Sequence, residues 1–447
     1  MTRISADVLP PQVNDSLSAD LARRVPFAFA SFAGVLILLA YLAPLHYTWN
    51  QSVTFDDQDD ESAIVTARDG AFQKQLALGT LGLVGLATLA FSKDKLLQIK
   101  GPLAWICIAY VAWCAASFLW TGDRFITLRR VIGFACEVLA GIAIAQRASP
   151  RQFVWLVFGC TLSWLSLGVM AELSHGTFQP WRPDYRFMGM FYPNIMAGNC
   201  VLLTLSSFYL CFAVPERKRL LQVVGCLAIA FLVLTGSRTA MGTLLMLLAL
   251  FVWFKASTPK KLLVGGAIGL AAACLLAVLT VGDFKDPTEL ASMGRVDHDL
   301  GSLTGRVPLW QELVDVYASQ KPLAGHGFGA FWTPDRIEDV AESQGWSPAY
   351  AHSTYIDLLL SIGLVGAILF VAAIVPALVR AARLEARFPA AGYGFIALLL
   401  ACILVDGVLE TNFGATSFMS FFGSCAVIYV LCSARRSLQV PLDNAIA

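Results

Sequence analysis

A series of apolar segments, each close to the length that crosses a lipid bilayer, is the feature that most constrains how this chain can fold. A membrane-spanning helix needs about 20 predominantly apolar residues. Such segments lie near residues 26–46, 75–92, 102–120, 131–146, 153–173, 194–214, 220–236, 239–254, 262–281, 354–376, 391–409 and 413–432. The sequence therefore predicts an all-α polytopic membrane protein with about 12 transmembrane helices.

Composition supports a membrane protein over a set of soluble domains. Of the 447 residues, 57% are hydrophobic and 14% are charged, whereas a soluble domain carries about 25% charged residues. All 11 cysteines lie in apolar stretches, with no spacing typical of a metal site or a disulfide framework. The net charge is +1 and no basic cluster is interleaved with aromatic residues, so we expect no nucleic-acid partner.

The distribution of Lys and Arg predicts the topology, because cytoplasmic loops carry an excess of these residues. Alternate loops are basic, and those between them are acidic or mixed, as at residues 56–61. We expect the basic loops and both termini on the cytoplasmic side. The basic loops contain Lys93, Lys95 and Lys100; Arg147 and Arg151; Arg217, Lys218 and Arg219; Lys255, Lys260 and Lys261; and Arg380, Arg383 and Arg387.

These features predict five parts of the chain. Residues 1–25 form a cytoplasmic tail without the apolar region and cleavage site of a signal peptide. Transmembrane helices one to nine occupy residues 26–281, and the last three occupy 352–432. A long periplasmic loop, 282–351, separates the two groups, and residues 433–447 form a cytoplasmic tail.

The long loop is too polar to span the membrane, and loops of this length are commonly functional. Within it, Leu309, Leu313, Val316 and Tyr317 recur at helical spacing after Pro308, a residue suited to a first helical turn. We expect this segment to form a helix on the outer surface of the bundle. The glycines and aromatic residues of 324–332 predict a close-packed turn, which could lie against a sugar or a lipid.

Two helix starts follow from local signals. Thr354 and Asp357 have the spacing of a capping pair, so a helix should begin near Thr354, with His352 just outside its anion-favouring N-terminus. The segments 220–236 and 239–254 could form one apolar run. Gly236 as a helix stop and Ser237 as the next cap instead predict a tight turn between them.

Five segments place cationic or titratable side chains at the outer ends of the predicted spans. They contain Arg129 and Arg130, Arg186, Arg238, Arg306 and His352. Each arginine alone could lie at the interface or pair with a carboxylate. Because the positive-inside bias opposes cations on this side, we expect an anionic group to balance their charge. Two or more arginines near helix starts suit a diphosphate, whose oxygens accept their paired hydrogen bonds.

Acidic residues offer further candidates. Asp297 and Asp299 flank His298 in the long loop and could bind a divalent metal, although short acidic triplets are common in solvated loops. Glu137, Asp406 and Glu410 lie within or at the ends of apolar segments. Glu410, near the outer end of its span, could pair with one of the arginines or contact a substrate. Asn194 could cap the helix that follows Pro193.

The order and spacing of these motifs resemble the O-antigen ligase and polymerase superfamily, and within it the exopolysaccharide polymerases. The motifs are Trp120 with Leu128, Arg129 and Arg130, then residues 186–194, 234–238, 303–310, 325–332 and 352–355. The resemblance implies a GT-C-type glycosyltransferase of the bacterial inner membrane. Its donor would be a glycan on undecaprenyl diphosphate at the periplasmic face. Its reaction would be inverting and metal-independent, without a cofactor.

The resemblance also implies roles for individual residues. Arg238 and Arg306 would hold the diphosphate, with Arg186 assisting, and His352 would act at the acceptor hydroxyl. Fixed arginines can stabilise charge on a leaving diphosphate without a metal, and histidine has a pKa suited to a base near neutral pH. Arg130, Tyr355 and Glu410 are secondary candidates.

We expect the protein to polymerise lipid-linked repeat units, so its partners would be the glycan donor, a glycan acceptor, membrane lipids and other polysaccharide assembly proteins. Ligation to lipid A core or to a protein hydroxyl is an open alternative, because the motifs concern the donor. A transporter of the same lipid is a more distant one. It would be expected to show inverted repeats and interrupted helices, and no clear internal repeat is seen.

Overall fold

The computed structural model of the chain describes residues 27–42, 72–91, 100–182, 185–255, 306–346, 348–413 and 417–436. Among these residues the regular structure is helical, and none lies in a strand. The α-helices are α2 (Phe27–Leu42), α4 (Phe72–Phe91), α5 (Pro102–Ala116), α6 (Arg124–Arg147), α7 (Pro150–His175), α8 (Pro193–Ala213), α9 (Lys218–Leu234), α10 (Arg238–Lys255), α13 (Arg306–Glu312), α14 (Pro334–Gln344), α15 (Thr354–Arg387), α16 (Tyr393–Asp406) and α17 (Phe418–Arg436).

The described helices are those of a multi-pass membrane protein. By length and composition, five can cross a membrane: α4, α5 with its following turn, α7, α8 and α15. Shorter apolar stretches lie in α2, α10, α16 and α17. Helices overlap every predicted apolar segment except 262–281, which lies outside the described residues. Also outside them are residues 1–25, the carboxylates Asp297 and Asp299, and residues 437–447.

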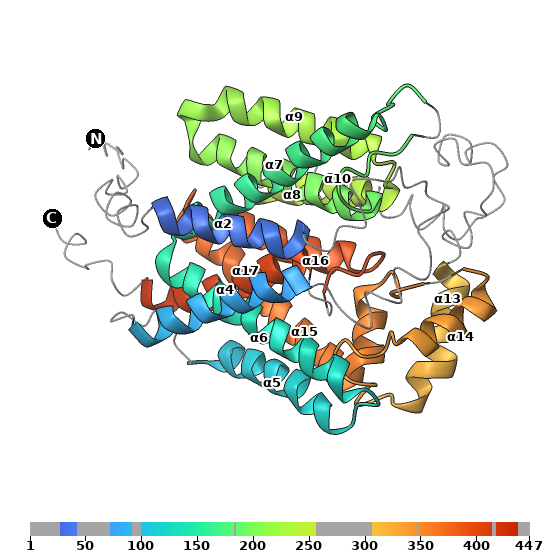
Figure 1. The fold of residues 1–447 in the computed structure, drawn as a ribbon. Helices are drawn as coiled ribbons and strands as arrows, with labels where there is room; N and C mark the ends of the chain where they lie inside the picture. Colours follow the sequence, from blue (N-terminus) through green and yellow to red (C-terminus); the bar gives the residue numbers. More distant parts are fainter. Residues whose placement is uncertain are drawn as a thin grey trace, which may run out of the picture.

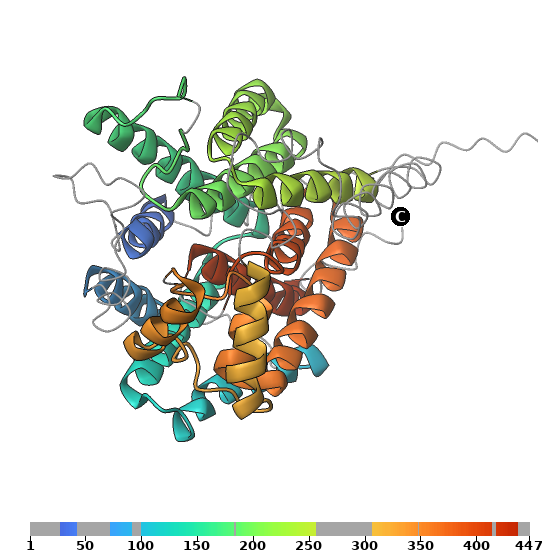
Figure 2. The same ribbon diagram turned by 90° about the vertical axis from the view of Figure 1, so that its right-hand side faces the viewer.

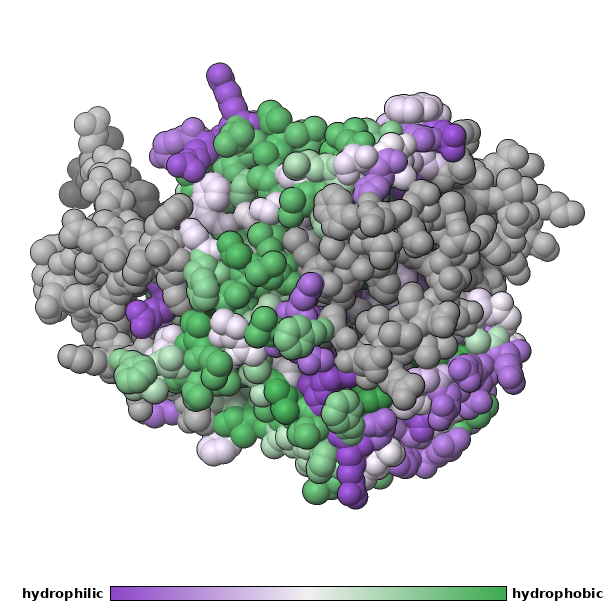
Figure 3. Space-filling view, viewed as in Figure 1, coloured by the Kyte–Doolittle hydropathy of each residue, from purple (hydrophilic) through white to green (hydrophobic). Residues whose placement is uncertain are grey.

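The helices form a bundle with two short helices at one end. Figure 1 shows the long helices side by side, with α13 and α14 beyond the end at which α15 begins, and Figure 2 views the bundle from that end. On the face drawn in Figure 3, hydrophobic residues cover much of the middle, and hydrophilic residues gather over α13 and α14. An apolar middle with a polar end suits a bundle that is surrounded by lipid.

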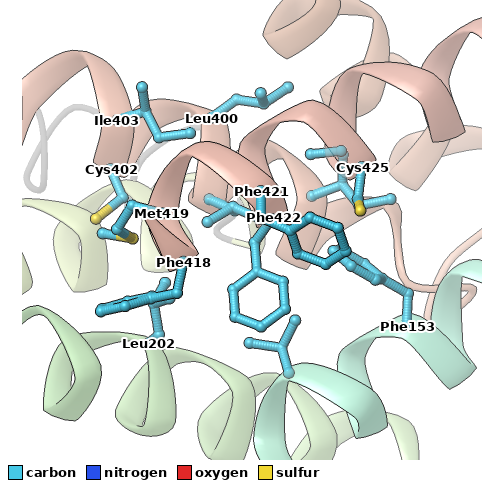
Figure 4. Packing of buried hydrophobic residues seen from close by; sticks show 14 of the residues in the cluster. Phe153, Leu202, Leu400, Cys402, Ile403, Phe418, Met419, Phe421, Phe422 and Cys425 are labelled. Atoms are coloured by element: carbon cyan, nitrogen blue, oxygen red, sulfur yellow. The ribbon is translucent and has the colours of Figure 1, made fainter. Parts of the chain in front are cut away.

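The core joins helices that are far apart in the sequence. Phe418, Phe421 and Phe422 of α17 are buried beside Phe153 of α7 and Leu202 of α8 (Figure 4). The Phe153 and Phe422 ring centroids are 6.2 Å apart with the rings at 72°, an edge-to-face arrangement that aromatic pairs favour. This packing fixes the positions of α7, α8 and α17, and so of the loops at their ends.

Basic loops meet at one end of the bundle. Arg151, at the start of α7, donates from Nε to the carbonyl of Ala390 between α15 and α16, at 2.9 Å. The guanidinium of Arg217, between α8 and α9, lies 5.6 Å from the ring centroid of Trp155 in α7. The segment that carries Arg186 joins the other ends of α7 and α8, and the segment that carries His352 leads into the other end of α15.

Helix α15 is interrupted at Gly363, whose φ of 68° and ψ of −175° are not helical. The chain from Pro322 to Gly327 takes over the hydrogen bonds that this break leaves open. Leu360 and Ser361 accept from the amides of His326 and Gly327, each at 2.8 Å, and the Leu364 amide donates to Pro322 at 2.8 Å. Backbone polar groups must be paired inside the protein at membrane depth, so this segment completes the helix. Residues 326 and 327 of the predicted close-packed turn therefore pair with α15.

The structure also tests the two predicted helix starts. Helix α15 begins at Thr354, as expected, but the capping pair is wrong: the N-cap is Ser353, without a side-chain cap, and Thr354 and Asp357 bind neighbouring loops instead. The turn between α9 and α10 is correctly predicted. Gly236 adopts a φ of 63°, and the carbonyl of Ser237 accepts the first α10 bond, from Met241, at 3.2 Å.

The surface helix begins at Arg306, so Pro308 lies in its first turn. Leu309 and Leu313 are buried as expected, but Val316 is 49% exposed. The reason is that residues Leu313–Tyr317 form a π-helix. A π-helix has more residues per turn than an α-helix, so Ala318 turns inward in place of Val316.

Candidate functional site

Three side chains from separate segments converge on the carboxylate of Glu410, in the turn between α16 and α17. Arg306 Nη2 and Asn194 Nδ2 donate to Glu410 Oε1 at 2.9 and 3.0 Å. His352 Nδ1 lies 3.8 Å from Glu410 Oε2. The Arg306, His352 and Glu410 side chains are only 14%, 17% and 12% exposed, so solvent screens their charges less than at an open surface.

Backbone contacts fix Glu410 against the start of α15. The amide and hydroxyl of Thr354 both donate to the Glu410 carbonyl, at 3.2 and 3.0 Å, and the Thr354 hydroxyl accepts from the Asn412 amide at 2.8 Å. The Leu409 carbonyl also accepts from Arg306 Nη1. The predicted pairing of Glu410 with one of the arginines is therefore present, and Arg306 is that arginine.

The surroundings of Glu410 favour its charged form. Burial raises the pKa of this carboxyl, but the His352 ring and the Arg306 guanidinium beside it more than offset that rise, so its pKa lies below the usual value. Burial, reinforced by the Glu410 charge, raises the pKa of Tyr350, which stays a neutral hydroxyl near neutral pH. The site thus combines one fixed negative charge with cationic and hydrogen-bonding groups.

His352 has an unusual backbone conformation. Its φ is +51°, a left-handed value that is uncommon for residues other than glycine. The Tyr350 and Trp346 rings lie 4.4 and 5.8 Å from the imidazole, measured between centroids. Nδ1 is buried without a hydrogen-bond partner among the described residues. Such strain is held by surrounding structure and is typical of functional positions.

Asp357 holds the segment that precedes His352. Its carboxylate accepts from the Ala351 amide at 3.2 Å, the Trp332 indole N–H at 2.7 Å and the Thr411 hydroxyl at 2.5 Å. The Trp310 indole N–H donates to the Ala351 carbonyl at 2.7 Å. The chain just before His352 is therefore tied to α13, to the turn at 332 and to the Glu410 segment.

Arg186 joins this group through Asn194. Its Nε donates to the Thr235 carbonyl at 2.9 Å, and its Nη2 donates to Asn194 Oδ1 at 3.4 Å. A Cβ at Gly236 would lie 3.3 Å from Arg186 Nε, so the turn between α9 and α10 fits closely around this side chain. Asn194 does not cap α8 as expected, since the N-cap is Tyr192; its amide bridges Arg186 and Glu410.

Arg238 is the first residue of α10, directly after the turn that Arg186 contacts. Helix α10 is tied to the Glu410 segment by Asp406, which accepts from the Thr243 hydroxyl at 3.1 Å and from Asn412 Nδ2 at 2.6 Å. The start of α10 therefore lies at the same end of the bundle as Arg186, Arg306 and His352.

The structure places Arg130 and Tyr355 in other contacts. Arg130 packs against Gly329, where a Cβ would lie 2.9 Å from the arginine Cγ, and its Nε is buried without a hydrogen-bond partner among the described residues. The Tyr355 hydroxyl donates to the Leu404 carbonyl at 2.7 Å and so joins α15 to α16. Neither side chain is part of the hydrogen-bond chain from Arg186 to Arg306.

Three residues that hold the site were not predicted in this role from the sequence. Asn194 was expected only as a helix cap and Asp357 only as half of a capping pair. No role was predicted for Glu172, whose carboxylate accepts from the amides of Met188 and Gly189 close to Arg186. A carboxylate inside an apolar segment is unexpected unless it has partners. That signal was present for Glu172, and its partners could only be seen in the fold.

Comparisons with known proteins agree with the resemblance seen in the motifs. A family model described as O-antigen ligase matches residues 223–371, which run from α9 into α15 and include Arg238, Arg306 and His352. The chain is also 24% identical over 388 residues to the exopolysaccharide production protein ExoQ of Rhizobium meliloti (strain 1021). That similarity covers 81% of this chain and 85% of ExoQ.

Proposed function

We propose, from its similarity to the O-antigen ligase family and to ExoQ, that this chain is a member of the O-antigen ligase-like superfamily and a membrane glycosyltransferase of the GT-C type. It moves a glycan from undecaprenyl diphosphate to a glycan acceptor at the periplasmic face of the bacterial inner membrane. The acceptor is another lipid-linked repeat unit, so the product is a growing exopolysaccharide chain. The main support is the convergence of Arg306, His352 and, through Asn194, Arg186 on Glu410.

In this proposal the arginines bind the donor diphosphate. Negative charge develops on the leaving diphosphate as the bond to the anomeric carbon breaks, and fixed arginines in a partly desolvated site stabilise it. Arg306 and Arg238 make the main contacts and Arg186 assists. Arg306 is paired with Glu410 in the structure, so a diphosphate competes with this carboxylate for the guanidinium.

His352 acts as the base in this proposal. Its Nε2 takes the proton of the acceptor hydroxyl while the hydroxyl oxygen attacks the anomeric carbon from the side opposite the diphosphate, which inverts that centre. Undecaprenyl diphosphate leaves with the electrons of the broken bond. The Nδ1 side of the ring faces Glu410, whose charge stabilises the imidazolium that forms, as a carboxylate does in a Ser-His-Asp triad. The reaction needs no cofactor and no divalent metal.

Aromatic rings beside His352 provide a surface for sugars. Trp346 is 38% exposed and lies on one side of the imidazole, and Tyr350 lies closer to it. An exposed indole offers a flat apolar face with a polar edge, which suits the C–H face of a pyranose ring. We assign Trp346 to the acceptor side of the site.

The remaining parts of the proposal concern the membrane. The basic end of the bundle and both termini face the cytoplasm, in keeping with the positive-inside rule, and the Glu410 end faces the periplasm. About 12 helices cross the membrane, with residues 282–351 forming the periplasmic loop. Membrane lipids and other polysaccharide assembly proteins are the expected partners.

The proposal is tested with purified protein in liposomes that contain a defined lipid-linked oligosaccharide. His352→Ala should bind the donor but lose turnover, and Arg238→Ala or Arg306→Ala should lower both donor affinity and rate. Arg124→Ala, an exposed arginine at the same end of the bundle, is the control and should behave like the unchanged protein. Full activity in both arginine variants would reject the diphosphate site. Turnover should also continue in chelator, whereas a divalent-ion requirement would redirect attention to Asp297 and Asp299.

Ligation is the alternative reaction, and the description of the matching family as O-antigen ligase favours it. The two reactions share the donor and differ in the acceptor. Label transferred from donor to lipid A core, or to a protein hydroxyl, would support ligation. Lipid-linked chains of increasing length, formed from repeat units alone, support polymerisation.

A further inference from the structure

Glu172 is a buried carboxylate in the last turn of α7, 3% exposed. Its Oε1 accepts from the amides of Met188 and Gly189, at 2.9 and 2.7 Å. Its Oε2 accepts from the Tyr185 hydroxyl at 2.5 Å. A buried charge is costly unless it is fully hydrogen-bonded, and these three donors satisfy it. None of the steps proposed above uses this residue.

All three donors lie in the short segment that carries Arg186. Tyr185 comes directly before it, and Met188 and Gly189 follow it. On the opposite side, the Phe187 amide donates to the Leu234 carbonyl at the end of α9, at 2.8 Å. Residues 185–189 are therefore held between Glu172 of α7 and the last turn of α9.

Close packing adds to this restraint. Gly189 has a φ of 58°, and a Cβ there would lie 3.0 Å from Gly168 Cα in α7 and 2.5 Å from Met196 Cε in α8. The segment thus lies directly against both helices. The Arg186 side chain extends from it to the Thr235 carbonyl and to Asn194.

We infer that Glu172 is a positioning residue, which fixes residues 185–189 so that Arg186 is already oriented when the donor diphosphate arrives. The inference rests on the proposed function, which gives Arg186 its part in binding the diphosphate. An irregular segment loses conformational entropy when it is ordered. Glu172 orders this segment before binding, so the loss does not reduce donor affinity.

A carboxylate suits this role better than other side chains. Glutamine at this position could still accept both backbone amides through its carbonyl oxygen, but its NH₂ group would face the Tyr185 hydroxyl. Alanine would remove all three bonds. Glu172→Gln therefore weakens the hydrogen bonding to residues 185–189, and Glu172→Ala removes it, while both leave Arg186 itself unchanged.

The test is a double-mutant cycle on the full-length protein in lipid nanodiscs. Binding of undecaprenyl diphosphate, without a glycan, is measured for the unchanged protein, Glu172→Ala, Arg186→Ala and the double variant. Glu172→Ala should weaken binding about tenfold to a hundredfold, the loss in affinity that follows removal of groups that orient ligating residues in metal sites. Arg186→Ala should lower the affinity for undecaprenyl diphosphate by a similar factor. The double variant should bind no more weakly than Arg186→Ala alone, because Glu172 acts through Arg186.

Further readouts separate positioning from general damage to the fold. Glu172→Ala should raise the donor KM and leave the acceptor KM unchanged, and Glu172→Gln should recover most of the affinity. Tyr185→Phe, which removes one bond, replaces Glu172→Ala if that variant does not fold. Exposed Glu216 at the basic end, changed to Gln, is the control and should bind normally.

The outcomes distinguish this inference from the proposed function. Normal affinity in Arg186→Ala contradicts the donor role of Arg186 and with it that part of the proposed function. Weak binding in Arg186→Ala, together with losses that multiply in the double variant, contradicts the Glu172 inference alone. Normal affinity in folded Glu172→Ala, or in Tyr185→Phe where that variant stands in, also overturns it.

Discussion

Glu410→Gln separates the two tasks that the site combines. The substitution removes one negative charge and keeps the size and shape of the side chain. Arg306 Nη2 lies 2.9 Å from Oε1, and His352 Nδ1 lies 3.8 Å from Oε2. Because one carboxylate faces both the diphosphate-binding arginine and the base, losing its charge should affect binding and turnover differently.

The effect on turnover follows from the distance to His352. Two unit charges about 4 Å apart interact by about 4 kcal/mol at an effective dielectric constant near 20. The imidazole becomes charged only as it takes the proton, so this stabilisation belongs to the transition state and not to the bound substrate. Allowing for rearrangement and residual solvent, a loss of about 2–4 kcal/mol remains, which lowers kcat about thirtyfold to a thousandfold.

The effect on donor binding should have the opposite sign or be absent. In the structure the Glu410 carboxylate accepts a hydrogen bond from the Arg306 guanidinium, the group that is proposed to bind the diphosphate. Glutamine accepts a weaker, uncharged hydrogen bond, so it competes less. We therefore expect the affinity for undecaprenyl diphosphate to be unchanged or higher.

The assay measures kcat with a lipid-linked oligosaccharide and the dissociation constant of undecaprenyl diphosphate on the same preparation. Glu342→Gln, an exposed glutamate in α14, is the matched control. An unchanged kcat would refute the role of Glu410 toward His352. A kcat that falls together with donor affinity would show that Glu410 supports the binding site and does not compete with the diphosphate.

Three further predictions follow from single contacts. The His352 ring and the Arg306 guanidinium lower the pKa of Glu410. The charge of Glu410 therefore stabilises the folded state above the ordinary carboxyl pKa, and this stabilisation is lost as the pH falls through the lowered value. Between pH 7 and about pH 3 the melting temperature should fall less in Glu410→Gln than in the unchanged protein. Trp346→Ala should raise the acceptor KM about tenfold without changing donor affinity, and a changed donor affinity would contradict its assignment. Gly363→Ala should cost about 2 kcal/mol or more in stability, because Gly363 has a φ of 68° and a Cβ there would meet the Leu323 carbonyl. Gly159→Ala is the control and should leave the stability unchanged, because a Cβ there meets nothing within 4 Å. Equal melting temperatures for the two variants would contradict this reasoning.

The helices of this protein could be predicted because lipid leaves few alternatives for a long apolar segment. The turn at Gly236 was also predictable, since a left-handed residue at that position favours glycine. The break at Gly363 was not predicted, although a glycine occupies it. The segment that completes its hydrogen bonds lies about 40 residues earlier in the sequence, and periodicity does not report contacts over such a separation.

The candidate site was predicted as a set of residue types and not as a set of contacts. Arg186 and Arg306 stood out because the positive-inside bias opposes cations on that side of the membrane, and His352 stood out because it lies just before the start of a long apolar helix. Thr354 and Asp357 were misassigned because a capping pattern in the sequence cannot show that a neighbouring loop takes the same groups. Val316 was placed inward because an α-helical period was assumed through a segment that forms a π-helix.

The most direct test of the central claim follows the bond between glycan and diphosphate in a purified system. Liposomes containing the protein and one defined undecaprenyl-diphosphate-linked repeat unit are sampled over time. We expect release of undecaprenyl diphosphate in step with the formation of longer lipid-linked glycans, and neither product with His352→Ala. Donor that crosses the bilayer with its glycosidic bond intact, or release that continues without His352, would contradict it.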